Sequence, residues 1–214
     1  MKVSIFGASG RAGLLLTERC LEAGHDVTVL LRTPGGFPLR ERERVRVLEG
    51  SVFDPPAVRQ TVEGADVVLS ALGARSLRKE DVLERAVPLI VTAMRQTQVS
   101  RIIVLGSAGA LQDSLRKQPA WRRWLVQKIV YNTVLKWAVA SQIAQWHTLS
   151  ASGLDFTMVM PPMLTDGRAR GSYRVDGEAL PPGAIRIARA DVADFMVQQI
   201  ASPAWVGKGV YIAY

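Results

Sequence analysis

A glycine-rich turn close to the N-terminus has residue types and spacing that suit phosphate binding. The sequence Gly7-Ala8-Ser9-Gly10-Arg11-Ala12-Gly13 follows the apolar run Val3–Phe6 directly and opens a helical pattern. In such a unit the first glycine permits a tight turn, the second lets the backbone approach phosphates, and the third lets helix and strand pack closely. The free N–H groups at the helix N-terminus then hold the pyrophosphate of a dinucleotide. The predicted contacts come from Gly7, Ser9, Gly10, Arg11, Ala12 and Gly13, and the alternative is a turn that binds nothing.

An arginine follows the second apolar run, Val27–Leu31. NAD-preferring domains place an Asp or Glu at this point to hold the ribose 2′-hydroxyl, whereas an arginine suits a 2′-phosphate. A guanidinium group pairs with phosphate through two parallel hydrogen bonds. Arg32 therefore predicts NADPH as the cofactor, and Arg11 could add a second positive charge. The alternative is an exposed arginine on a basic protein.

Two more loops follow apolar runs and could reach the same ligand. The first is Ser70-Ala71-Leu72-Gly73-Ala74-Arg75, and the second is Gly106-Ser107-Ala108. Loops at the carboxyl ends of parallel strands line the ligand crevice, so we expect Leu72, Gly73 and Arg75 to contact the cofactor. Ser107 is placed to hydrogen-bond a reacting carbonyl or the nicotinamide amide. A serine that only caps the next turn is a close second alternative.

The usual acid/base pair for alcohol oxidation, a tyrosine with a lysine four residues later, is absent. Tyr131 has Leu135 at that position, and Tyr173 has Gly177. The sequence also has no group of Cys, His and carboxylate residues spaced for a metal site. The two histidines, His25 and His147, are expected at the surface rather than in catalysis.

The loops described above need a parallel sheet to hold them. Apolar strands alternate with helical patterns, which predicts an α/β fold: a single Rossmann-like, doubly wound parallel sheet with helices on both faces. We expect one domain over residues 1–214, with substrate-side insertions at about 110–137 and 163–184. The predicted strands are Val3–Phe6, Val27–Leu31, Val45–Leu48, Ala65–Ala71, Arg101–Leu105 and Phe156–Met160, with Val210–Ile212 at an edge. The predicted helices are Arg11–Ala23, Asp54 to Gly64, Glu80–Gln98, a long one ending near Gly153, and a last one capped by Asp191. Pro161–Gly183 is expected to be loop or short hairpin.

Composition narrows the setting. The chain has 27 basic and 19 acidic residues, a net charge of +8, which attracts anions of several kinds. No apolar run is long enough for a membrane span, and no secretory signal is visible. The single cysteine, Cys20, is expected on a buried helix face, so we expect a reducing, cytoplasmic setting.

A basic, tryptophan-bearing stretch, about residues 116–137, allows three interpretations. Trp121, Trp124, Leu125, Lys128 and Ile129 fall at helical spacings, so the favoured prediction is that the apolar members pack while the arginines stay in water. A lid or substrate entry comes second. Nucleic acid or an anionic membrane comes last, and both are expected to be unlikely partners.

Together these residues resemble the atypical short-chain dehydrogenase/reductase group, and within it the flavin reductase/biliverdin-IXβ reductase (NAD(P)H-binding, NmrA-like) family. The resemblance covers nearly the whole chain. It rests on Ile5–Gly10, Val27–Arg32, Leu72–Arg75, Ser152–Leu154, Val159–Pro162, Asp166 and Gly171–Tyr173.

The resemblance implies NADPH laid across the strand ends, with an open pocket above the nicotinamide for flavins or planar tetrapyrroles. Hydride would pass to the flavin N5 or the bilin bridge carbon, and the proton could come from solvent, so no tyrosine is needed. It further implies that Ser107 is the active-site serine, that Arg32 and Arg75 contact the cofactor phosphates, and that Met160 and Pro161 lie beside the nicotinamide. Ser51 and Val52 would lie near the adenine, and Met163 and Leu164 would line the substrate pocket.

Two functions remain open. One is an NADPH-dependent reductase of a flavin, a biliverdin-type tetrapyrrole or a similar planar acceptor, which Ser107 and an apolar wall of Leu105, Met160 and Met163 favour. The other is a non-catalytic NAD(P)-sensing regulator that acts through a protein partner. A sugar-nucleotide epimerase or dehydratase is disfavoured by the missing tyrosine–lysine pair. A monomer is slightly favoured.

Overall fold

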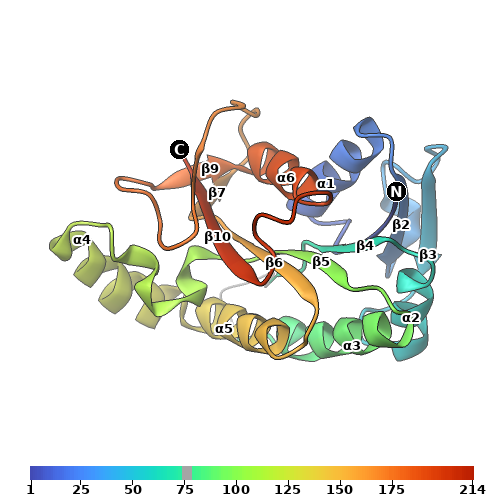
Figure 1. Cartoon of the computed structure of the whole chain (residues 1–214), viewed down its shortest axis with the longest axis horizontal. Coiled ribbons are helices and arrows are strands. Elements are labelled where there is room, and N and C mark those ends of the chain that lie inside the picture. Colours follow the sequence, from blue (N-terminus) through green and yellow to red (C-terminus); the bar gives the residue numbers. More distant parts are fainter. Residues whose placement is uncertain (74–78) are drawn as a thin grey trace.

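The computed structural model describes residues 1–73 and 79–214 and is built on one eight-stranded sheet. Figure 1 shows the sheet between two helical layers. Its strand order is β3-β2-β1-β4-β5-β6-β10-β8, and every pairing is parallel except that of β8 with β10. The strands are β1 (Lys2–Phe6), β2 (Asp26–Leu31), β3 (Val45–Glu49), β4 (Val67–Ser70), β5 (Arg101–Leu105), β6 (Asp155–Met160), β8 (Arg174–Asp176) and β10 (Lys208–Ala213). A second, two-stranded sheet pairs β7 (Met163–Thr165) with β9 (Arg186–Ala188) in parallel.

The helices cover both faces of the sheet. Helices α1 and α6 lie on one face, and α2, α3 and α5 lie on the other (Figure 1). Their bounds are α1 (Arg11–Glu22), α2 (Pro55–Val62), α3 (Val82–Gln96), α4 (Ala120–Leu125), α5 (Lys136–Ser150) and α6 (Arg189–Gln198). The predicted Rossmann-like α/β fold is confirmed.

Burial on both faces explains the continuous apolar runs of the strands. Along β1, Ile5 packs into the core beneath α1 and α6, whereas its neighbour Phe6 packs into the core beneath α2 and α3. Cys20 lies fully buried in the first of these cores, as expected, and burial raises its pKa to about 12. Successive side chains of one strand thus pack alternately into two separate cores, one on each face of the sheet.

Three details of the C-terminal third differ from expectation. Strand β10 is not an edge strand, because β8 continues the sheet beyond it. Residues 161–183 are mostly loop, as expected, but they also contain two short strands that do not form a hairpin with each other: β7 pairs with β9, and β8 pairs with β10. Asp191 does not cap α6 but lies fully buried in its first turn. Its carboxylate accepts hydrogen bonds from the Arg170 and Gly171 N–H groups and from the Tyr214 hydroxyl.

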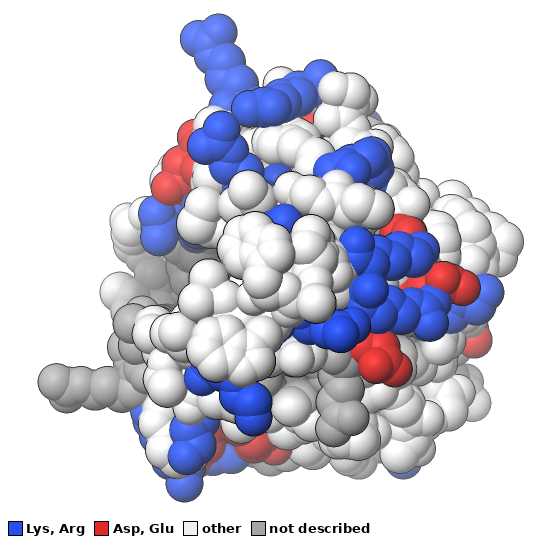
Figure 2. All heavy atoms as spheres, turned by 90° about the vertical axis from the view of Figure 1, so that its left-hand side faces the viewer, with Lys and Arg blue, Asp and Glu red and all other residues white. Residues whose placement is uncertain are grey.

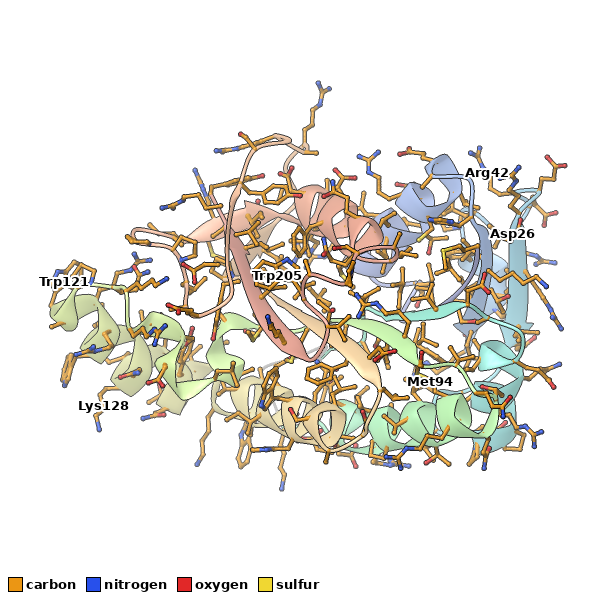
Figure 3. The ribbon with its side chains drawn as sticks, viewed as in Figure 1. Asp26, Arg42, Met94, Trp121, Lys128 and Trp205 are labelled. Atoms are coloured by element: carbon orange, nitrogen blue, oxygen red, sulfur yellow. The ribbon has the colours of Figure 1, made fainter. Side chains whose placement is uncertain are left out.

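The basic tryptophan stretch forms a helical run that projects at one end of the molecule (Figures 1 and 3). The predicted long helix is interrupted, because a π-helical segment, Val126–Val134, separates α4 from α5. The expectation that the apolar side chains pack is wrong: Trp121 is 70% exposed and Trp124 is 60% exposed. No helix among the described residues is both long and apolar enough to cross a bilayer.

Candidate functional site

A cleft opens at the carboxyl ends of β1 and β4, where the strand order reverses direction. Doubly wound sheets bind their ligands at this switch point, because the loops after the two strands diverge to opposite faces and leave a crevice between them. The cleft has a volume of about 440 Å³. It is lined by Gly7, Ser9, Gly10, Arg11, Ala12, Ala71, Leu72, Gly73 and Arg189. The fold therefore brings together the glycine turn and the loop after β4, as expected.

The structural reasons given for two of the glycines are confirmed. Gly7 has φ +81°, a conformation that strains other residues, and a Cβ there would lie 2.8 Å from the Ala71 backbone. A Cβ on Gly13 would overlap the Gly7 carbonyl oxygen, so only glycine lets α1 approach the turn this closely. That these residues contact a cofactor stays a prediction.

The N-terminus of α1 faces the cleft without a cap. Gly10 occupies the N-cap position, no side chain caps the first turn, and no acidic residue lies in it. Helical hydrogen bonding begins when the Leu14 N–H donates to the Gly10 carbonyl at 2.8 Å. The N–H groups and the positive end of the helix dipole can therefore receive a phosphate.

Two arginines and one aspartate stand at the mouth of this cleft. Asp166 accepts from Arg11 Nη1 at 2.7 Å and from Arg189 Nη1 at 2.5 Å. Asp166 is about half exposed and Arg11 more so, whereas Arg189 keeps only 15% of its side chain exposed. The pair of guanidinium groups can bind an anionic ligand, and Asp166 would then compete with that ligand.

Sequence reasoning missed Arg189. A signal was present, because Arg11 and Arg189 each open a helix, where a cation opposes the helix dipole unless an anion is close by. The spatial meeting of the two arginines, 178 positions apart (189 − 11), could not be read from the chain.

The residues expected around the adenosine half lie on neighbouring loops. Arg32 is exposed at the end of β2, next to the strand that carries the glycine turn. Ser51 accepts a hydrogen bond from the Phe53 N–H at 3.2 Å, and Val52 packs against the core. Arg75 lies outside the described residues.

Ser107 is fixed where β5 and β6 end. The flanking Gly106 N–H donates to the Val159 carbonyl at 2.7 Å, and the Ala108 N–H donates to the Pro161 carbonyl at 3.0 Å. The Ser107 Oγ accepts from the Gly109 N–H at 3.4 Å, so the serine does cap a short turn. This contact uses a lone pair and leaves the hydroxyl proton free to donate to a ligand.

A second cavity of about 510 Å³ lies between this turn and the π-helical segment. The ring of Tyr131 lies close to Gly109, which belongs to the short turn that Ser107 caps. Burial raises the pKa of Tyr131 to about 12, and Arg122 opposes that rise only in part. Tyr131 therefore stays protonated at neutral pH and cannot act as an ionised base. Sequence reasoning had set it aside for want of a lysine partner.

Four residues expected beside the nicotinamide or the acceptor differ in exposure. The Met160 side chain is fully buried against Trp146 and the α5 side of the sheet, so only its backbone could meet a cofactor. Pro161 is also buried, but its carbonyl holds the Ser107 turn. Met163 is 58% exposed, and Leu164 is half-buried. The expected wall of Leu105, Met160 and Met163 is wrong, because Leu105 also faces the core.

Comparison with known proteins supplies an independent test. A model of an NAD(P)H-binding family matches residues 7–203. Among curated proteins, YwnB of Bacillus subtilis is 30% identical over 111 residues, which is 52% of this chain and 49% of YwnB. Barley dihydroflavonol 4-reductase is 25% identical over 187 residues, 76% of this chain and 52% of that enzyme. The matches thus span about half the length of these relatives.

Solved structures show the same fold along the whole chain. A Burkholderia pseudomallei protein predicted to be exported has 26% identity and a TM-score of 0.81, with 100% of both chains covered. A short-chain dehydrogenase/reductase from Veillonella parvula, in complex with NADP, has 20% identity and a TM-score of 0.80, covering 100% and 94%. The anaerobilin reductase ChuY of Escherichia coli O157:H7 has 21% identity and a TM-score of 0.79, covering 100% and 97%.

The family match confirms the prediction of an NAD(P)H cofactor, and the solved structures confirm the fold.

Proposed function

Because this chain belongs to the NAD(P)H-binding family, we propose that it is an NADPH-dependent reductase that passes hydride to a flavin, a biliverdin-type tetrapyrrole or a similar planar acceptor. The observation that carries the proposal is the cleft at the β1/β4 switch point. It joins an uncapped helix N-terminus, a turn in which a Cβ on Gly7 or Gly13 would clash, and two arginines. A dinucleotide pyrophosphate fits this set of donors.

Each part of the site has a distinct task in the proposed reaction. The glycine turn and the N-terminus of α1 bind the pyrophosphate, and Arg11 and Arg189 neutralise its charge. NADPH, when bound, supplies the hydride. Ser107 donates a hydrogen bond that orients the acceptor or the nicotinamide amide.

Solvent supplies the proton in this proposal. Tyr131 has a pKa raised by burial, and no lysine appears among the groups that shift it. The tyrosine is therefore not activated as an acid/base catalyst. Reduction of a flavin or bilin needs no acid/base residue beside the atom that receives the hydride. The proton that completes the reduction can come from water.

NADPH rather than NADH is proposed because Arg32 follows β2, a position from which an arginine suits a 2′-phosphate, and no Asp or Glu occupies that position. Arg32→Asp should weaken NADPH binding at least about 10-fold more than NADH binding, because a charge-assisted pair is replaced by repulsion. Titration of both nucleotides measures the ratio. Equal losses for NADPH and NADH would refute the role of Arg32.

The activity itself is tested by following NADPH absorbance with FMN, riboflavin, biliverdin and a quinone as acceptors. Ser107→Ala should lower kcat at least about 10-fold with little change in NADPH affinity, since it removes one oriented donor. Ser152→Ala is a control, because that serine is buried in a helix-end turn. Tight NADPH binding without oxidation by any acceptor would sink the reductase proposal.

That negative outcome would favour the second candidate, an NAD(P)-sensing regulator that acts through a protein partner. The observation behind it is that neither Tyr131 nor Tyr173 has a lysine four residues later. A cytoplasmic, monomeric protein stays a prediction from the sequence.

A further inference from the structure

The helical run from Ala120 to Val134 carries large apolar side chains that are exposed to solvent. Trp121, Trp124, Leu125 and Ile129 are spaced at i, i+3, i+4 and i+8 and are 70%, 60%, 40% and 46% exposed. We call these four residues the tryptophan face. Exposed clusters of this kind on a folded protein mark interaction sites, because monomers rarely leave contiguous large apolar surface in water.

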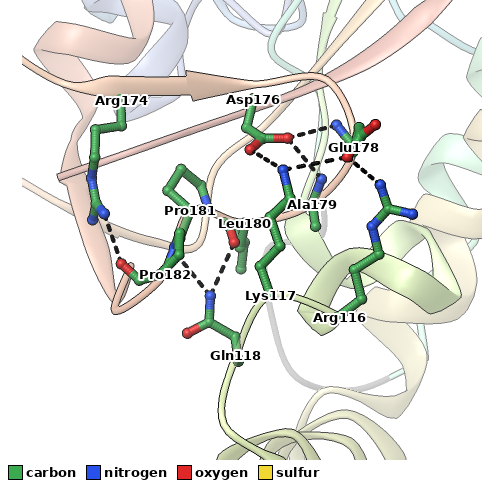
Figure 4. A network of polar contacts seen from close by, with 10 residues as sticks. All are labelled: Arg116, Lys117, Gln118, Arg174, Asp176, Glu178, Ala179, Leu180, Pro181 and Pro182. Atoms are coloured by element: carbon green, nitrogen blue, oxygen red, sulfur yellow. Dashed lines mark hydrogen bonds and ion pairs between the residues drawn. The ribbon is translucent and has the colours of Figure 1, made fainter.

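The exposure is imposed by the other side of the run, which is tied to the body of the protein. Arg122 donates to the Gln118 Oε1 at 2.8 Å and to the Ala184 carbonyl at 2.6 Å. Gln118 in turn donates to the carbonyls of Leu180 and Pro181 at 3.0 and 2.8 Å (Figure 4). The side of the run that faces the protein body thus carries Arg122 together with Val126 and Tyr131, which pack against the core, and the four residues of the tryptophan face lie on the other side.

The helical run that carries this face is rich in cations. No Asp or Glu occurs from Ser114 to Leu154, whereas Lys and Arg occur repeatedly. Arg116 pairs with Glu178 and Lys117 pairs with Asp176, so the charges of these two cations are neutralised within the protein (Figure 4). The exposed cations that remain are Arg123, Lys128 and Lys136. Figure 2 shows uncharged side chains in the middle of this end of the molecule with Lys and Arg around them.

The residue types of this face favour one of its possible binding partners over the others. A second copy of the chain would bring like charges together across a two-fold axis, which is unfavourable. Protein interfaces favour tryptophan but are depleted of lysine. Tryptophan and leucine with Lys and Arg on a helix that lies at the surface are typical of segments that bind the headgroup region of an anionic bilayer. The face also stands on a projecting helix rather than in a groove, which suits a flat surface.

We propose that the tryptophan face docks this protein on the surface of membranes that contain anionic lipids. Trp121, Trp124, Leu125 and Ile129 enter the headgroup boundary, and Arg123, Lys128 and Lys136 contact the lipid phosphates. This reverses the order expected from sequence, in which membrane binding came last. The inference does not depend on the proposed reductase activity.

Sedimentation of the full chain with vesicles tests it. The protein should bind vesicles of phosphatidylcholine mixed with phosphatidylglycerol, bind phosphatidylcholine alone weakly, and dissociate as salt rises. Trp121→Ser with Trp124→Ser should lower the partition coefficient at least about 10-fold. Arg123→Glu with Lys136→Glu should lower it at least about 30-fold, since each cation near the surface contributes about fivefold.

Arg42→Glu with Arg46→Glu is the matched control for charge. It makes the same change in net charge on exposed residues, and Arg42 lies at the end of the molecule opposite Trp121 and Lys128 (Figure 3). Its vesicle binding should stay within about threefold of the parent, and unchanged thermal unfolding verifies that all variants fold. Equal loss in both charge variants would overturn the proposal, as would no binding to the phosphatidylglycerol vesicles. A dimer lost in the tryptophan variant, or tighter binding to a single-stranded oligonucleotide than to vesicles, would also overturn it.

Discussion

Replacing Asp166 by asparagine should strengthen the binding of NADPH. The Asp166 carboxylate holds both guanidinium groups at the mouth of the cleft, Arg11 at 2.7 Å and Arg189 at 2.5 Å. A pyrophosphate that enters the cleft must take these donors from the carboxylate and must also approach its negative charge. Asparagine keeps the size of the side chain while it removes the charge, so both obstacles fall.

The magnitude follows from the exposure of the three side chains. Arg11 and Asp166 are 73% and 57% exposed, which places their ion pair at the low end of the range for surface pairs, about 0.2–0.5 kcal/mol. Arg189 is only 15% exposed, so its pair is stronger, about 0.8–1 kcal/mol. Their sum, about 1–1.5 kcal/mol, corresponds to a dissociation constant lowered about 5- to 10-fold.

Titration of NADPH into parent and variant, at low and high ionic strength, measures the effect. The gain should shrink as salt rises, because exposed charges are screened. Asp26→Asn is the control. It makes the same change in charge at the N-terminal end of β2, away from the carboxyl ends of the strands where the cleft lies (Figure 3). An Asp166→Asn variant that binds NADPH as weakly as the parent, or more weakly, would show that Asp166 does not compete with the cofactor.

Three further outcomes are expected. Gly13→Ala should lower the free energy of unfolding by about 1–3 kcal/mol and abolish measurable NADPH binding, because the new methyl group overlaps the Gly7 carbonyl. The control Gly35→Ala, where no atom lies within 4 Å of the new methyl group, should change neither quantity. Asp191→Asn should cost about 2–3 kcal/mol in a denaturant titration, since an amide cannot accept all the hydrogen bonds that the buried carboxylate receives, and a loss below about 1 kcal/mol would contradict this. Native Cys20 should resist a thiol reagent at neutral pH, because burial raises its pKa to about 12, and should react after denaturation; stoichiometric labelling of the folded protein would count against its burial.

Periodicity and turn chemistry predicted the first two-thirds of the sheet well. The strand Arg101–Leu105 was predicted with its observed bounds, and β1, β2 and β3 were each predicted to within a residue at either end. β1, β2 and β5 are largely buried on both faces, so their sequences are mostly apolar runs that need no distant partner to be recognised. The edge strand β3 was recognised although Arg46 and Glu49 in it are exposed. Edge elements such as β7 and β8 are three residues long, too short for any periodicity, and their pairing partners lie far along the chain.

Predictions about which way a side chain faces were less successful. Met160 was placed beside the nicotinamide by the family resemblance and the tryptophans of α4 were placed by helical spacing, yet the Met160 side chain is buried and the tryptophans are exposed. Spacing tells which residues share a face of a helix or strand but not what covers that face. For α4 the decision came from Gln118 and Arg122, whose polar side chains find carbonyl partners in residues 180–184.

The sequence by itself determined the glycine turn, the strand that leads into it and the family of its cofactor. Local chemistry suffices there, because Gly7 needs a positive φ, Gly13 needs space, and the helix that follows has no acidic first turn. Only the tertiary structure decided what surrounds that turn. Arg189 and Asp166 reach it from the other end of the chain, and the side chains of α4 face water because their anchors face inward. Such contacts join residues far apart in sequence, and their energies depend on distances that no local pattern contains.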